Sequence, residues 1–114
     1  MRVLLDTSAY AALRHGHAQI VDACNRSESV CLNAVVIGEL LGGFRKGKLR
    51  RQNELALRAF LAESKAAALP VDAETAECYS AILDDLRKAG TAVGSNDLWI
   101  AASAMQYGLR LVTT

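Results

Sequence analysis

The stretch Gly94-Ser95-Asn96-Asp97-Leu98-Trp99-Ile100-Ala101-Ala102 decides how this chain of 114 residues folds. Its glycine predicts a turn, and the serine or asparagine that follows is expected to cap a helix. Asp97 falls in the first turn, where the helix dipole favours a negative charge. From residue 98 to residue 105 only Ser103 is polar, so we expect this helix to be covered on most sides. An acid held at the start of a buried helix is the first candidate functional residue.

Outward from this stretch, short apolar strands alternate with helices. Strands are expected at residues 2–6, 29–32, 67–71 and 109–113. Helices are expected at residues 7–13, 20–26, 34–44 and 49–65, between Asp72 and Gly90, and between Gly94 and Gly108. Thr7 or Ser8 is the expected cap of the first helix, and Asn33 that of the third. The alternation predicts one domain over residues 1–114, a small three-layer α/β/α fold with a mainly parallel central sheet.

The bulk composition is that of an ordinary globular protein. Apolar residues make up 52% and charged residues 22%, and the net charge is +1, so any affinity for nucleic acid must come from local clusters. No apolar run approaches the length of a membrane helix, and no secretory signal is visible. Three cysteines without metal-type spacing indicate buried thiols in a reducing compartment, which predicts a cytoplasmic protein.

Two further acids stand in apolar surroundings. Asp6 follows the first strand, and so lies at the carboxyl edge of a parallel sheet, where such folds bind ligands. Glu39 lies inside the helix over residues 34–44. Its neighbours on the same helix face are Val35, Val36, Gly42 and Gly43. This face predicts that Glu39 points into packed protein, and the two glycines predict close approach of another segment.

Electrostatics limits what three neighbouring carboxylates can do. Unit charges about 4 Å apart repel by about 4 kcal/mol at an effective dielectric constant near 20. Three such contacts would cost about as much as the stability of a whole domain, so the acids must share protons or bind a cation. An all-oxygen site with few protein ligands suits Mg²⁺ or Mn²⁺. Singly, Asp6 also fits a helix cap, Asp97 a dipole partner, and Glu39 a buried salt bridge.

Four segments together resemble a known family. They are VLLDTS (3–8), VVIGELLGG (35–43), GSNDLWIAA (94–102) and LRLVT (109–113). In this order and spacing they are similar to the PIN-domain ribonucleases, and within these to the VapC-like toxins of bacterial toxin–antitoxin pairs. The resemblance implies an endoribonuclease dependent on Mg²⁺ or Mn²⁺, a small antitoxin partner and a homodimer.

The resemblance also implies roles for residues. Asp6, Glu39 and Asp97 match the acidic positions that hold the metal and cleave RNA, and Thr7, Ser8 and Asn96 match positions of supporting hydrogen-bonding groups. The family pattern usually continues after the last strand to a fourth acid, and this sequence ends at Thr114 just before that position. The domain is therefore expected to lack its C-terminal end. The alternative interpretation is a weakly active or non-catalytic binding module on the same fold.

A basic cluster follows the helix that carries Glu39. Five of the 13 basic residues fall within seven positions: Arg45, Lys46, Lys48, Arg50 and Arg51. They are candidates for contacts with RNA phosphates, and a solvated loop explains them equally well. A phosphoacceptor related to receiver domains is a further alternative. It calls for a lysine near the end of a late strand, where this chain has only Arg110.

Overall fold

A four-stranded parallel sheet forms the centre of the computed structural model, which describes residues 1–114. Its strands are β1 (Arg2–Leu5), β2 (Ser29–Asn33), β3 (Ala66–Leu69) and β4 (Arg110–Val112). They lie in the order β3-β2-β1-β4, and each neighbouring pair is parallel. The chain winds outward from β1 to β3 and then returns to place β4 on the other side of β1. The winding therefore reverses between β1 and β4, where parallel sheets bind ligands beyond the strands' carboxyl ends.

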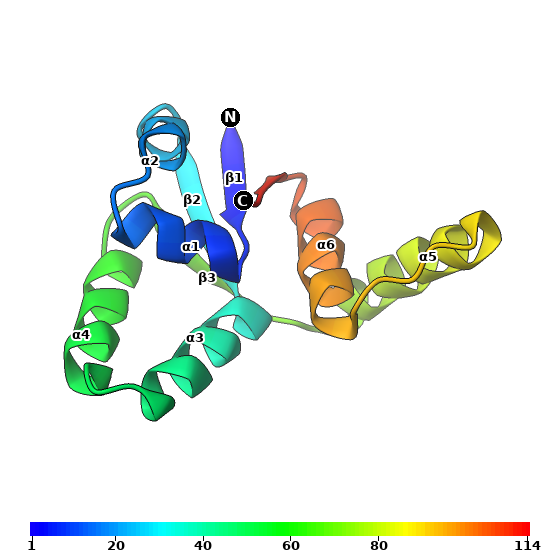
Figure 1. Cartoon of the computed structure of the whole chain (residues 1–114). Helices are drawn as coiled ribbons and strands as arrows, with labels where there is room; N and C mark the ends of the chain where they lie inside the picture. Colours follow the sequence, from blue (N-terminus) through cyan, green and yellow to red (C-terminus); the bar gives the residue numbers. More distant parts are fainter.

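Six helices surround the sheet (Figure 1). They are α1 (Thr7–Arg14), α2 (Ala18–Asn25), α3 (Ala34–Lys46), α4 (Arg50–Leu61), α5 (Ala73–Ala89) and α6 (Ser95–Tyr107). Helices α1, α2 and α4 lie on one side of the sheet, and α6, with α5 against it, lies on the other (Figure 1). This is the expected three-layer α/β/α fold with a parallel sheet. None of the helices has both the length and the apolar composition needed to cross a bilayer.

The central strand fixes the position of the residue that follows it. Val3, Leu4 and Leu5 of β1 have no exposed surface, because helices cover both faces of the strand. Fully burying one such side chain stabilises the fold by about 1.5–3 kcal/mol, so β1 cannot slide without a large cost. Asp6, the next residue, is therefore anchored at the carboxyl edge of the sheet.

Helix α5 extends away from the sheet and is attached to the body through α6 (Figure 1). Tyr79 stacks on Trp99 with ring centroids 4.2 Å apart. The hydroxyl of Thr75, a fully buried residue, donates to Oε1 of Gln106 at 2.5 Å. These contacts tie α5 to α6. The contact of Thr75 is with the last turn of α6, at the other end of that helix from Asp97, which makes Thr75 a useful control below.

Local capping signals predicted some helix ends correctly. Asn33 caps α3 by accepting a hydrogen bond from the Val36 amide, and Asp72 caps α5 with a reciprocal capping box. Gly90 and Gly108 end α5 and α6 with φ values of 71° and 63°, a left-handed conformation that glycine adopts without strain.

Two capping predictions were wrong. Helix α1 is capped by Asp6, whose carboxylate accepts from the Ala9 amide, and not by a hydroxyl of the next two residues. Helix α6 begins after Gly94 without any side-chain cap, so Ser95 and Asn96 are already within its first turn. The side chain of Asn96 instead bonds another helix, as described below.

Replacing Tyr10 by Phe is expected to stabilise the protein. Tyr10 is 2% exposed, and its hydroxyl is buried without a hydrogen-bond partner. Burial also raises the pKa of this phenol. Because an unsatisfied buried polar group is costly, Tyr10→Phe should raise the free energy of unfolding by about 1 kcal/mol. Urea unfolding of both proteins measures the difference, with the half-buried Tyr79→Phe as the control. A loss of stability would show that the hydroxyl has a partner in solution.

Candidate functional site

The three candidate acids, Asp6, Glu39 and Asp97, are called the acidic edge below. Asp6 follows β1, and its backbone N–H donates to the Val112 carbonyl of β4 at 3.1 Å. Asp6 therefore lies at the reversal point of the sheet. Glu39 lies in α3, and Asp97 lies in the first turn of α6. Each acid is thus carried by a different part of the fold, and the question is whether their side chains meet.

Only one oxygen of the Asp6 carboxylate accepts hydrogen bonds. Its Oδ1 accepts from the Ala9 amide and from the Ser8 hydroxyl, both at 2.8 Å. Its Oδ2 makes no hydrogen bond. The interpretation of Asp6 as a helix cap is therefore confirmed, and the cap occupies only one of its two oxygens. Ser8 bonds the same oxygen as the cap, and its role beside a metal ligand stays a prediction.

Glu39 joins three helices. Its Oε1 accepts from the Thr7 hydroxyl of α1 at 2.5 Å, and its Oε2 accepts from the Asn96 amide of α6 at 3.1 Å. Thr7 is adjacent to Asp6, and Asn96 is adjacent to Asp97. The hydrogen bonds of Glu39 therefore draw the segments that carry all three acids to one place at the edge of the sheet.

The expected surroundings of Glu39 were wrong. Glu39 is exposed and does not point into packed protein. A Cβ added at Gly42 or Gly43 would meet no atom within 4 Å, so neither glycine allows close approach of another segment. The reason is that α3 buries only the stripe that includes Val36 and Leu40, and much of the rest of the helix is exposed. Glu39 lies beside this stripe.

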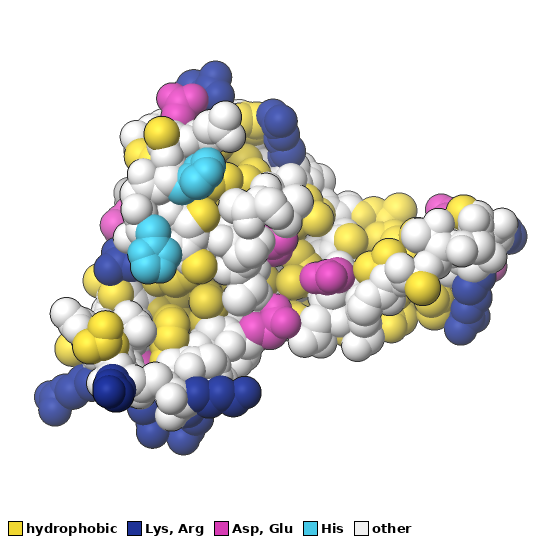
Figure 2. All heavy atoms as spheres, in the orientation of Figure 1, with side chains coloured by type: hydrophobic (Ala, Val, Ile, Leu, Met, Phe, Trp, Pro, Cys, Tyr) yellow, Lys and Arg dark blue, Asp and Glu magenta, His cyan; other side chains and the backbone are white.

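The acidic edge has no protein cation as a partner. Asp97 is exposed, and its carboxylate makes neither a hydrogen bond nor an ion pair. The four ion pairs of the protein all lie elsewhere: Met1–Glu28, Arg26–Asp22, Arg50–Glu54 and Lys88–Asp84. The buried salt bridge that was an alternative for Glu39 is absent. The three acids therefore stand on neighbouring segments with no Lys or Arg paired to them. Acidic side chains lie near the middle of the face in Figure 2.

The side chains do not form a closed metal cage. No group of three or more His, Cys, Asp or Glu side chains is arranged to hold a metal ion. The donors that are present nevertheless fit Mg²⁺ or Mn²⁺, because Oδ2 of Asp6 and the carboxylate of Asp97 are oxygen ligands without partners. Mg²⁺ commonly binds through one or two carboxylates, several waters and substrate phosphates. The metal role of Asp6, Glu39 and Asp97 stays a prediction.

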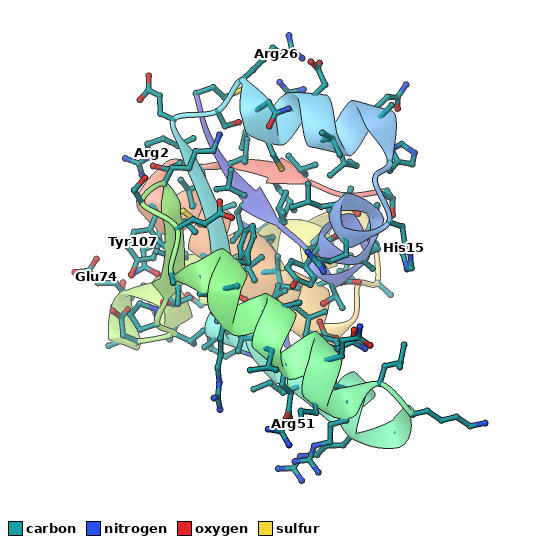
Figure 3. The ribbon with its side chains drawn as sticks, turned by 90° about the vertical axis from the view of Figure 1, so that its left-hand side faces the viewer. Arg2, His15, Arg26, Arg51, Glu74 and Tyr107 are labelled. Atoms are coloured by element: carbon teal, nitrogen blue, oxygen red, sulfur yellow. The ribbon has the colours of Figure 1, made fainter.

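The five basic candidates lie at the end of α3, in the connection and at the start of α4, and are called the basic turn below. Arg45, Lys46, Lys48, Arg50 and Arg51 are all exposed. Basic side chains gather along the lower edge of the molecule, and Arg51 lies at its outer margin (Figures 2 and 3). Arg50 pairs with Glu54 at 3.2 Å, which leaves four of the five without an acidic partner. Glu39 and Arg45 are six residues apart on one helix, about 9 Å along its axis.

Sequence reasoning missed one buried contact near the site. Asn33, predicted only as a helix cap, also donates to the Ser103 hydroxyl of α6 at 2.9 Å. Both residues are fully buried. The available signal was Ser103 itself, the single polar residue in an apolar helical run, because a buried hydroxyl needs a partner. Its partner is 70 positions away in the sequence, so no local pattern identifies it.

Comparisons with known proteins agree with this architecture. The family model described as PIN domain matches residues 3–114. Ribonuclease VapC of Rickettsia bellii is 31% identical over 99% of this chain and 84% of that protein. The structure of VapBC2 from Rickettsia felis, bound to a promoter DNA fragment, superposes with a TM-score of 0.83 at 26% identity, over 99% of this chain and 86% of that one. The structure of VapBC-5 from Mycobacterium tuberculosis, a member of the VapBC family of toxin–antitoxin systems, superposes with a TM-score of 0.76 at 30% identity. The match covers 98% of this chain and 83% of that one.

Proposed function

Because the chain belongs to the PIN domain family, we propose that it is an endoribonuclease that hydrolyses RNA phosphodiester bonds with the help of Mg²⁺ or Mn²⁺. The observation that supports this most is the pair of hydrogen bonds from Thr7 and Asn96 to Glu39. These bonds bring three unneutralised acids to the ligand-binding edge of the sheet. The edge is open to solvent at Glu39, Asn96 and Asp97, which suits a polymeric substrate.

Each acid has a distinct role in this proposal. Asp6, through Oδ2, and Asp97 would hold the divalent ion. The ion, when bound, supplies positive charge beside the scissile phosphate and lowers the pKa of a water molecule. Glu39 is fixed by donors on both of its oxygens, so it is oriented to help hold the ion or to accept a proton from the attacking water. In-line attack of the water oxygen on phosphorus then breaks the bond from phosphorus to the leaving oxygen.

The same proposal includes a small antitoxin partner. A groove of about 290 Å³ runs between α1, α3 and α4, and six of its nine lining residues are hydrophobic, among them Leu40, Phe44 and Leu49. Leu49 and Leu55 are 59% and 55% exposed on the surface of the same region. Exposed apolar side chains that gather beside a candidate site indicate a protein contact. Leu40 of the groove follows Glu39 in α3, so a partner bound there would contact the helix that carries Glu39.

Cleavage of RNA by the purified chain should require a divalent ion. We expect single-stranded RNA to be cut in Mg²⁺ or Mn²⁺, to stay intact when EDTA is present, and to be cut again when Mn²⁺ is added in excess, because the unneutralised acids cannot otherwise approach a phosphate. A gel assay of end-labelled RNA measures this. Undiminished cleavage in EDTA would contradict the proposal. Binding of RNA and metal without cleavage would instead identify a non-catalytic binding module.

A further inference from the structure

The side chain of Asn33 makes hydrogen bonds to two helices, α3 and α6. Its Oδ1 accepts from the Val36 amide at 2.9 Å, which caps α3. Its Nδ2 donates to the Ser103 hydroxyl at 2.9 Å and to the Trp99 carbonyl at 3.3 Å, both on α6. The side chain has no exposed surface. A single buried amide thus joins the helix that carries Glu39 to the helix that carries Asn96.

The spacing of the two contacts between α3 and α6 indicates that they fix how one helix lies along the other. Asn33 and Glu39 are six residues apart, which is about 9 Å along a helix axis, and their partners Ser103 and Asn96 are seven apart, about 10.5 Å. On α6, residues seven apart lie on the same face. On α3, residues six apart differ by about 120° around the axis, so the bridges start from the N-cap and from the long side chain of Glu39. Two bridges at nearly equal spacing, one buried and one exposed, therefore hold α6 in a single register against α3.

The two bridges differ in strength. The exposed hydrogen bond between Asn96 and Glu39 competes with water, and such a bond contributes only about 0.5–1.5 kcal/mol. Breaking the buried bridge leaves Ser103 without its donor in a site that water does not reach, which is more costly. The buried bridge is therefore the one that sets the register, and the exposed bridge follows from it.

We propose that Asn33 is a positioning residue for the acidic edge: its amide fixes α6 on α3 so that Asn96 reaches Glu39 and Asp97 stands beside it. Asn33 touches neither substrate nor metal. Its catalytic effect rests on the nuclease function proposed above, whereas its effect on the Asn96–Glu39 contact does not. Because a cap needs only an acceptor, the amide donor of Asn33 is the group that serves the site.

The main variant is Asn33→Ser, which keeps a capping oxygen, adds no charge and replaces the amide donor to α6 by a shorter hydroxyl. Ser103→Ala removes the acceptor and leaves Asn33 in place, so it decides the question if Asn33→Ser does not fold. Thr75→Val is the matched control. Thr75 is also fully buried and bonds α6, but at Gln106 in the last turn of that helix, away from Asn96. The unfolding midpoint of each of the three variants measures how much stability the substitution costs.

Two readouts separate positioning from stability. The first is the NMR signal of the Asn96 side-chain amide and its shift upon Glu39→Gln. We expect a clear shift in the wild-type and Thr75→Val backgrounds and a strongly reduced one in Asn33→Ser and Ser103→Ala. The second is steady-state cleavage, in which Asn33→Ser should lower kcat by about 10- to 100-fold, as expected of a misplaced catalytic group, with little change in KM. Thr75→Val should leave kcat close to that of the wild type.

The proposal is overturned if Asn33→Ser and Ser103→Ala keep the wild-type response of the Asn96 amide, or if they lower kcat only as much as Thr75→Val does. A wild-type chain that cuts no RNA would overturn the proposed nuclease function alone. In that case the amide measurement still decides whether Asn33 positions Asn96 against Glu39, because it requires neither metal nor substrate.

Discussion

Asp97→Asn and Asp6→Asn should each lower the rate of RNA cleavage by at least about 100- to 1,000-fold, the cost of removing one preorganised charge-stabilising group. Neither change should unfold the protein. Asp97 is exposed and its carboxylate makes no hydrogen bond, so an isosteric amide leaves the packing as it is. At Asp6 the amide oxygen of Asn retains the cap of α1, since Asn and Asp cap helices about equally well.

The matched control for these variants is Asp84→Asn. Asp84 is an exposed acid on α5 that pairs with Lys88 at 2.9 Å, far from the acidic edge in the fold. Asp84→Asn changes the net charge by the same amount as Asp6→Asn or Asp97→Asn, and we expect it to cleave RNA at the wild-type rate. Single-turnover cleavage of labelled RNA, with circular dichroism to verify the fold, measures all three variants. Wild-type cleavage by Asp6→Asn or Asp97→Asn would exclude that residue from the mechanism.

The second large effect is expected at the basic turn. Replacing Arg45, Lys46, Lys48 and Arg51 by Gln should weaken RNA binding by about tenfold or more. It should also reduce the slope of log affinity against log salt concentration by about 0.7 for each RNA phosphate that the variant no longer neutralises. Arg50, which pairs with Glu54, should contribute less than Arg51. The reason is that an arginine without an acidic partner releases more counterion when it meets a phosphate.

Binding is measured by fluorescence anisotropy of labelled RNA over a range of salt concentrations, in EDTA so that no RNA is cut. Arg87→Gln with Lys88→Gln on α5 provides a control for the loss of exposed positive charge elsewhere, because these residues lie on the opposite arm of the protein. Lys88 pairs with Asp84, so Arg87 is the unpaired charge of this control. An unchanged salt slope in the variant of the basic turn would show that the cluster is an ordinary solvated loop.

The parts of the fold that the sequence predicted are those set by local physics. The apolar run of Val3 to Leu5 predicted a buried strand, and the rule for parallel sheets then predicted that Asp6 lies at the edge where such folds bind ligands. Asn33 and Asp72 have the side chains that cap helices, and Gly90 and Gly108 adopt the positive φ that ends them. Each of these signals is contained within a few neighbouring residues.

The errors share a different cause. The orientation of Glu39 was inferred from the apolar face of its own helix, but burial depends on what packs against that face, and part of α3 has no such neighbour. Asn96 was one of two candidate caps, the common local use of Asn, whereas the residue that its side chain bonds is 57 positions away. The bond between Asn33 and Ser103 spans 70 positions. Such contacts depend on how the helices are arranged around the sheet.

The central claim is that Asp6, Glu39 and Asp97 act as one site for a divalent ion. It is tested most directly by titrating the purified chain with Mn²⁺ and measuring free and bound ion by electron paramagnetic resonance, without RNA. The account predicts saturable binding near or below millimolar concentration that Mg²⁺ displaces and that Asp6→Asn or Asp97→Asn abolishes, while Asp84→Asn binds normally. Absence of binding, or equal binding by all these variants, would contradict it.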